Sequence, residues 1–153
     1  MYTIGNIVYG VPMPWKSDET RKVAAAHALD KSIAAKWIPL YNVGCTNADD
    51  QVADGDGEEL AVRIENGDTE EEFKEWLEPF GWEFAYHGGA DTSPGWLGVK
   101  IGQIDESDHL PIADIPQPTD EQRAEAKAKY DALPEGVREM LQPLALYIVW
   151  SSS

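Results

Sequence analysis

The chain has 153 residues, of which 28 are acidic and 12 are Lys or Arg, so its formal net charge is −16. This length suits one globular domain, and a hydrophobic content of 42% supplies a core, which excludes a long disordered chain. The charge repels phosphate backbones and anionic membranes, so it disfavours direct nucleic-acid binding and favours a basic partner protein. Solubility or adaptation to salt is the alternative explanation of the same charge.

Cysteine content and the first residues bear on localisation. The single cysteine, Cys45, cannot form an internal disulfide, which fits a reducing cytoplasm. Residues 1–15 carry no basic segment ahead of their apolar residues, so they predict a strand rather than a signal peptide. No apolar run approaches the roughly 18 residues that span a bilayer. We therefore expect a cytoplasmic protein without a membrane segment.

Strands and a helix are predicted in the first 65 residues. A strand is expected at Tyr2–Val11, which is rich in Ile, Val and Tyr. Ser17 can cap the following helix, whose apolar stripe is formed by Ala26, Leu29, Ile33 and Trp37. A second strand is expected at Ile38–Val43. After a polar loop, apolar residues alternate with charged ones over Leu60–Glu65, which is the strand period.

The second half predicts three further strands and three helices. Thr69 and Glu72 form a capping box for a helix that Pro79 and Gly81 end, and Thr119 and Gln122 form another. A short helix is expected at Glu135–Gln142. The strands are Trp82–Tyr86, Trp96–Ile104 and Ala145–Trp150, with a hairpin-like connection between the first two and an ordered, Pro-rich loop or crossover at residues 105–118.

This order of elements predicts the fold class. Strands and helices are mixed without a regular β-α-β alternation. We therefore expect a single α+β domain over residues 1–153, with one mixed or antiparallel sheet of about six strands and three to four helices packed on it.

Candidate catalytic and metal motifs are incomplete. The acidic residues 49–59 lack the bidentate Glu that an EF-hand loop needs at its twelfth position. His87-Gly88-Gly89 is similar to an esterase oxyanion loop, but the chain has no G-x-S-x-G nucleophile motif. No cofactor or metal is therefore predicted. A small hydrolase that uses His87 or His109 with carboxylates or a metal remains the alternative hypothesis, and it requires a histidine and two carboxylates in one concave site.

Aromatic residues beside Gly or Pro turns form the first candidate binding site. Such rings can stack on a planar ligand, and Gly-rich turns let a ligand approach backbone N–H groups. The alternative is that these rings pack the helices onto the sheet. The candidate ligand-binding residues are Tyr9, Trp15, Tyr86, His87, Asp91, Trp96 and Lys100.

An acidic helix face forms the second candidate site. Glu71, Glu75 and Glu78 recur at i, i+4 and i+7, so they share one side of the predicted helix. Carboxylates at this spacing can imitate a nucleic-acid backbone and occupy the basic groove of a partner protein. An ordinary solvated face is the alternative.

Three segments resemble a family of small acidic proteins of unknown function that tailed bacteriophages encode. The likeness touches about half of the chain, and the 58 residues that carry it are TIGNIVYGVP, PGWLGVKIGQIDE and TDEQRAEAKAKYDALPEGVREMLQPLALYIVWSSS. The resemblance implies a context, because short acidic phage proteins often bind and disable a host component, including antiviral defence systems. It carries over no functional residue.

The leading hypothesis is therefore a non-catalytic binding protein of phage type that antagonises a bacterial defence system. It would occupy a basic host protein as a nucleic-acid mimic, or sequester a small nucleotide-like ligand between the aromatic rings. Assembly into a homo-oligomer is left open.

Overall fold

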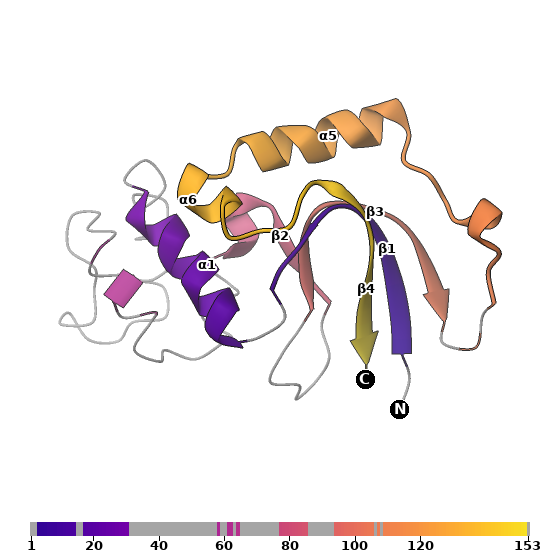
Figure 1. Ribbon diagram of the computed structural model, residues 1–153, viewed down its shortest axis with the longest axis horizontal. Coiled ribbons are helices and arrows are strands. Elements are labelled where there is room, and N and C mark those ends of the chain that lie inside the picture. The colour runs from indigo at the N-terminus through magenta and orange to yellow at the C-terminus, as the bar shows by residue number, and fades with distance from the viewer. Residues whose placement is uncertain are drawn as a thin grey trace. The chain divides into compact units, whose positions relative to one another are not determined.

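The computed structural model describes residues 3–14, 17–30, 58, 61–62, 64, 77–85, 94–105, 107 and 109–152 (Figure 1). The chain divides into two compact units. The first comprises residues 1–15, 81–133 and 141–153, and the second comprises residues 16–80 and 134–140. The two units are described separately.

The first unit contains a four-stranded antiparallel sheet within the described residues. Its strands are β1 (Thr3–Pro12), β2 (Trp82–Phe84), β3 (Gly95–Asp105) and β4 (Ala145–Ser152). Their order across the sheet is β2-β3-β1-β4, so β4 lies at one edge. β2 and β3 pair as the arms of a hairpin, with Trp82 opposite Leu97 and Phe84 opposite Gly95. The two strands are therefore neighbours in the sheet, and the predicted hairpin-like connection between them, residues 86–93, lies outside the described residues.

Helix α5 (Asp120–Asp131) packs against β3 and β1 and runs across one side of the sheet (Figure 1). The predicted capping box starts it. The Gln122 N–H donates to Thr119 Oγ1 at 3.1 Å, and the Thr119 N–H donates to Gln122 Oε1 at 2.9 Å. The Arg123 guanidinium lies 5.1 Å from the centre of the Tyr9 ring on β1. This contact identifies the face of the sheet that carries Tyr9 as the α5 face.

Alternation along the strands separates two faces of the sheet. Because neighbouring strand residues point to opposite sides, Ile7 shares the α5 face with Tyr9, whereas Val8 points to the other side. On that other side Val8, Trp96 and Val149 form a buried cluster. The register shifts between Ile7, which pairs with Gly102, and Val8, which pairs with Lys100. The extra residue in β3 keeps Gly102 and Ile104 on the same face as Ile7.

One pair of glycines lets β1 and β3 approach closely. Gly98 has φ +142°, a conformation that side chains rarely adopt, and it lies opposite Gly10. A Cβ added at Gly98 would overlap the Tyr9 carbonyl oxygen, and one at Gly10 would overlap the Leu97 carbonyl oxygen. These positions therefore exclude any side chain.

The second unit is helical in its described residues. It contains α1 (Ser17–Leu29), the 3-10 helix η2 (Glu78–Phe80) and α6 (Glu135–Arg138), which contacts α1. The His27 ring stacks on Phe80, with ring centres 5.2 Å apart and ring planes 14° apart. Pro79 lies within η2, and Gly81, which has φ +100°, follows its last residue. Most of the helix that these two residues were predicted to end lies outside the described residues.

The α+β class with an antiparallel sheet is confirmed, but the described residues form four strands rather than about six. The strand predicted at Leu60–Glu65 is wrong, because Ala61, Val62 and Ile64 are helical. Ala61 and Ile64 are buried while Val62 is 54% exposed. Buried residues three positions apart fit the period of a helix. The alternation of apolar and charged residues in the sequence had instead suggested a strand. The strand predicted at Ile38–Val43 lies outside the described residues.

Two helix predictions need correction. In α1 the predicted stripe is wrong, because Leu29 is 53% exposed and the buried side is formed by Thr20, Val23, Ala24, His27 and Ala28. Ile33 and Trp37 lie outside the described residues. The last helix ends at Arg138 rather than Gln142. There the Met140 N–H donates to the Val137 carbonyl, a three-residue spacing that closes the helix with a tight final turn.

Candidate binding site

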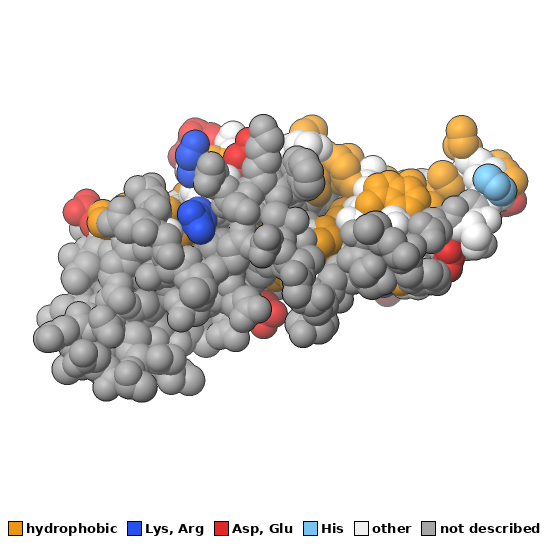
Figure 2. All heavy atoms as spheres, turned by 90° about the horizontal axis from the view of Figure 1, so that it is seen from below, with side chains coloured by type: hydrophobic (Ala, Val, Ile, Leu, Met, Phe, Trp, Pro, Cys, Tyr) orange, Lys and Arg blue, Asp and Glu red, His pale blue; other side chains and the backbone are white. Residues whose placement is uncertain are grey.

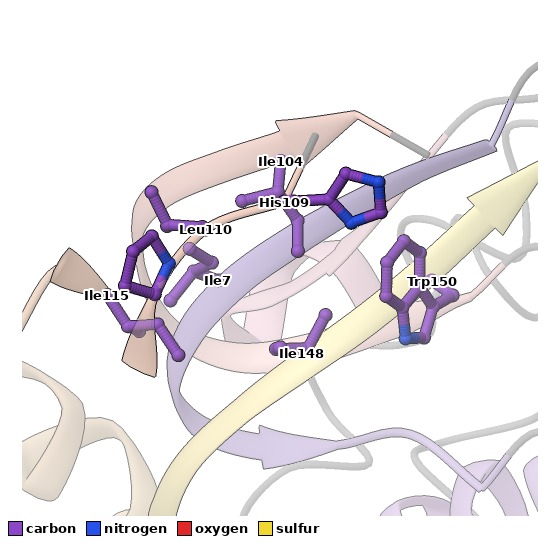
Figure 3. A pocket seen from close by; sticks show the side chains of 8 residues that line it. Ile7, Ile104, His109, Leu110, Ile115, Ile148 and Trp150 are labelled. Atoms are coloured by element: carbon purple, nitrogen blue, oxygen red, sulfur yellow. The ribbon is translucent and has the colours of Figure 1, made fainter. Parts of the chain in front are cut away.

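An apolar pocket of about 570 Å³ lies on the α5 face of the sheet (Figure 3). β1, β3 and β4 form its floor, and the segment from His109 to Ile115 lies over them. In Figure 3 the rings of His109 and Trp150 lie toward one end, and Leu110 and Ile115 toward the other. The lining residues are Ile7, Ile104, His109, Leu110, Pro111, Ile115, Ile148 and Trp150.

Gly5 opens space in the floor of this pocket. It pairs with Ile104 on one side and with Trp150 on the other. A Cβ at Gly5 would lie 2.7 Å from Ile104 Cγ1, 3.0 Å from Ile148 Cγ2 and 3.0 Å from Trp150 Cζ3. The three side chains therefore converge over a residue that has none of its own.

The covering segment has local structure of its own. It includes the 3-10 helix η3 (Ile112–Asp114), in which the Asp114 N–H donates to the Pro111 carbonyl at 2.9 Å. Pro116 follows it and lies over Gly102 of β3, within 3.1 Å of where a Cβ would stand. The residues from 105 to 118 were predicted to form an ordered loop or crossover, and the described part does so.

The described lining of the pocket is mainly apolar. Of the eight lining residues that the structure describes, seven are apolar and the eighth supplies an imidazole. The carboxylate of the nearby Asp105 accepts hydrogen bonds from the N–H and the hydroxyl of Ser107, at 3.1 and 3.2 Å. Among the residues that the structure describes, no group of three or more His, Cys, Asp or Glu side chains could hold a metal ion. The pocket is suited to apolar groups, with one ring that can donate or accept a hydrogen bond.

The structure separates the described members of the aromatic candidate site. Trp96 is 6% exposed, and its Nε1–H donates to Glu83 Oε2 at 2.8 Å on the face opposite α5. Tyr9 lies on the α5 face beneath Arg123. Lys100 is exposed and donates to Gln103 Oε1 at 3.0 Å. Tyr9 and Trp96 therefore do not line one cleft. Trp15, Tyr86, His87 and Asp91 lie outside the described residues.

The acidic candidate face is described at one position. Glu78 is exposed at the start of η2, directly after the helical Leu77. Glu71 and Glu75 lie outside the described part of the chain, so the acidic face stays a prediction.

Two histidines have different environments. His27 is buried in α1, and burial lowers its pKa from 6.5 to about 4, while the neighbouring Asp30 carboxylate opposes this shift. At neutral pH it is an uncharged core residue. His109 is exposed at the pocket, where a ligand can reach it.

The sequence analysis did not identify most of the pocket. Ile148 and Trp150, which are 40% and 50% exposed, lie on the strand that was predicted at Ala145–Trp150, but neither residue was assigned to a site. The sequence feature that could have pointed to these two residues is the run ALYIVWSS, which contains neither a charge nor a proline.

The chain matches no protein-family model, no curated protein and no solved structure. Among the described residues, none of the helices is both long enough and apolar enough to cross a membrane.

Proposed function

We propose that this protein is a non-catalytic binding protein that engages a basic partner protein. The observation that supports the proposal is the composition of the pocket, in which the described lining residues are one imidazole and seven apolar side chains, without a carboxylate among them. A histidine with two carboxylates in one concave site would have favoured the hydrolase. The pocket instead offers an apolar surface for binding.

The net charge indicates the kind of partner. A charge of −16 produces a long-range field that attracts basic surfaces and accelerates encounter with them. The same field opposes anionic ligands such as nucleotides. A nucleotide site would therefore need local stacking and cations, and the described rings Tyr9 and Trp96 lie on opposite faces of the sheet. A protein partner fits the described residues better.

The biological setting of the proposal is a bacterial host. The three segments that resemble small acidic phage proteins correspond to β1, to β3, and to the stretch from α5 to β4. The resemblance therefore concerns mainly the unit that carries the sheet and the pocket, together with residues 134–140 of the second unit. We propose that the partner is a component of an antiviral defence system in the host cytoplasm, and that binding inhibits it.

Affinity capture tests this proposal. Immobilised protein is incubated with host lysate at about 0.1 M salt, and bound proteins are identified by mass spectrometry and eluted with rising salt. We expect enrichment of a basic protein that elutes as the salt concentration rises, and inhibition of its activity by the purified protein. Enrichment of no basic protein, or retention that salt does not affect, would refute the proposal.

Charge reversal locates the acidic surface. The variant Glu71→Lys/Glu75→Lys/Glu78→Lys changes the predicted acidic face, and Glu121→Lys/Glu125→Lys/Glu135→Lys is a control with the same change in charge. If the predicted face binds the partner, the first variant loses much more affinity than the second. Equal losses would show that only the net charge matters and would exclude the helix face as the binding surface.

A further inference from the structure

Within the described part of the chain, the edge strand β4 shows none of the usual protections against pairing. Its eight residues read ALYIVWSS, without a charged residue or a proline, and β4 is the terminal strand in the sheet order. An edge strand presents the N–H and C=O groups of every second residue away from its partner. Natural proteins usually block such edges with Lys, Pro, a bulge or a covering segment. Among the described residues, β4 pairs with β1 on one side only.

The pocket continues directly from this edge. Ile148 and Trp150 are two residues apart, so they point to the same face of the sheet, and both line the pocket. Both are also substantially exposed, at 40% and 50%. In Figure 2 hydrophobic side chains gather on the described surface, with a histidine beside them. A strand added to β4 would place alternate side chains beside Ile148 and Trp150, above the pocket.

We propose that β4 and the adjacent pocket bind an extended segment of the basic partner protein as an added β-strand. This inference rests on the proposed function and names the surface and the form of the partner. Backbone hydrogen bonds along β4 supply register, and apolar side chains at alternate positions of the added strand enter the pocket. The segment carries Lys or Arg beside its apolar positions.

Charge selects this occupant over a second copy of the chain. A second copy also carries −16, so pairing two β4 edges brings two strongly negative molecules together. A basic segment instead gains from the field. Asp114 places an exposed carboxylate on η3, between the lining residues Pro111 and Ile115, where a flanking Lys or Arg of the segment can reach it.

A peptide assay tests the inference. The probe is a fluorescein-labelled peptide of about ten residues, with Val, Ile and Leu at alternate positions, Thr between them and two Lys at each end. We expect saturable binding at about 0.05 M salt, and binding at least about tenfold weaker when the flanking Lys are replaced by Glu. Hydrogen exchange of the amides at residues 145–152 should slow in the complex.

Matched variants locate the site. Trp150→Lys and Ile148→Lys add a charge to the edge and to the pocket, and we expect each to weaken peptide binding about tenfold. Leu29→Lys introduces the same charge at a side chain that is 53% exposed on α1, in the other unit, and should stay within about twofold of wild type. Circular dichroism confirms that each variant is folded.

Four outcomes of the peptide and variant experiments overturn the inference. The first two are that the peptide does not bind and that the Lys- and Glu-flanked peptides bind equally well. The other two are that the edge and control variants lose the same affinity for the peptide, and that the peptide slows hydrogen exchange only at residues outside 145–152. Sedimentation of the protein alone tests a second copy as occupant, since a dimer that Trp150→Lys abolishes would also overturn it. If a basic protein is captured and the variant Trp150→Lys retains it as well as wild type does, then β4 is not the binding surface. That result refutes this inference but not the proposed function. Edge binding of the peptide without any captured basic protein refutes the proposed function instead.

Discussion

Protonation of His27 should make the stability of this protein depend on pH. The side chain is buried in α1, with its ring stacked on Phe80. Burial lowers its pKa from 6.5 to about 4, and the Asp30 carboxylate offsets only part of that shift. The unfolded chain therefore takes up a proton at His27 at a higher pH than the folded chain does.

The two pKa values set the size and the pH range of the effect. Between them the unfolded state binds more protons, so the free energy of unfolding decreases as the pH falls. At about 1.36 kcal/mol per pH unit, the change from 6.5 to about 4 corresponds to a loss of about 3 kcal/mol. The loss starts near pH 6.5, amounts to about 1.4 kcal/mol at about pH 5.5, and is nearly complete at about pH 4.

Urea unfolding followed by circular dichroism measures this effect at a series of pH values between about 4 and 7.5. The test variant His27→Phe keeps a ring that can stack on Phe80 but has no titrating group. Subtracting its curve from that of wild type removes the contribution of the carboxylates, which titrate in both proteins. His109→Gln removes an exposed histidine and serves as the control, so its curve should follow that of wild type.

Parallel curves would refute the reasoning. If wild type and His27→Phe keep a constant difference, within about 0.5 kcal/mol from pH 6.5 to 4.5, then His27 is not held neutral by burial. The titration of the His27 ring, read from its carbon-bound protons by NMR, provides an independent check. A midpoint near 6.5 in the folded protein would contradict the predicted shift just as directly.

Two further predictions concern the sheet. Asn6 is buried and donates to the Val149 carbonyl at 2.9 Å, so Asn6→Ala should lower the free energy of unfolding in urea by about 1–3 kcal/mol, and a loss below about 0.5 kcal/mol would contradict this role. Gly98→Ala should lower it by at least about 2 kcal/mol, because the Cβ meets the Tyr9 carbonyl at a positive φ. Gly136→Ala is the control with open space around it, and it should be neutral or slightly stabilising; equal losses would disprove the steric argument.

Local sequence signals predicted most elements of the first unit. The capping box at Thr119 and Gln122 located the start of α5 because both hydrogen bonds lie within four consecutive residues. The apolar run of β1 also located a strand, since its β-branched residues are followed by Pro12 and Pro14. These signals act between near neighbours, so one sequence is enough to interpret them.

The predictions were wrong where contacts between residues distant in sequence determine the local structure. Leu60, Val62 and Ile64 alternate in sequence, yet the described residues in that stretch are helical, with Ile64 buried and Val62 exposed. In α1 the small residues Ala24 and Ala28 lie on the buried side together with His27, whereas the larger Leu29 is exposed. Hydrophobicity alone would have predicted that Leu29 is more buried than His27. Tertiary packing overrides local preference in both cases.

The pocket could not be predicted because it depends on strand register and on the order of strands in the sheet. Ile104, Ile148 and Trp150 converge over Gly5 only because β3 and β4 flank β1 on opposite sides. The extra residue in β3 is also necessary, since without it Ile104 would point to the other face. Neither feature leaves a mark in a single sequence.

The net charge and the apolar edge of β4 account for each other. An unprotected edge strand invites pairing between copies, and β4 contains no charge or proline to prevent it. A charge of −16 on every copy opposes that pairing at a distance, before the edges meet. The protein can therefore leave the edge apolar without a blocking residue. The basic segment of the proposed partner would not experience this repulsion, so the field that opposes pairing of copies would favour its approach to the same edge.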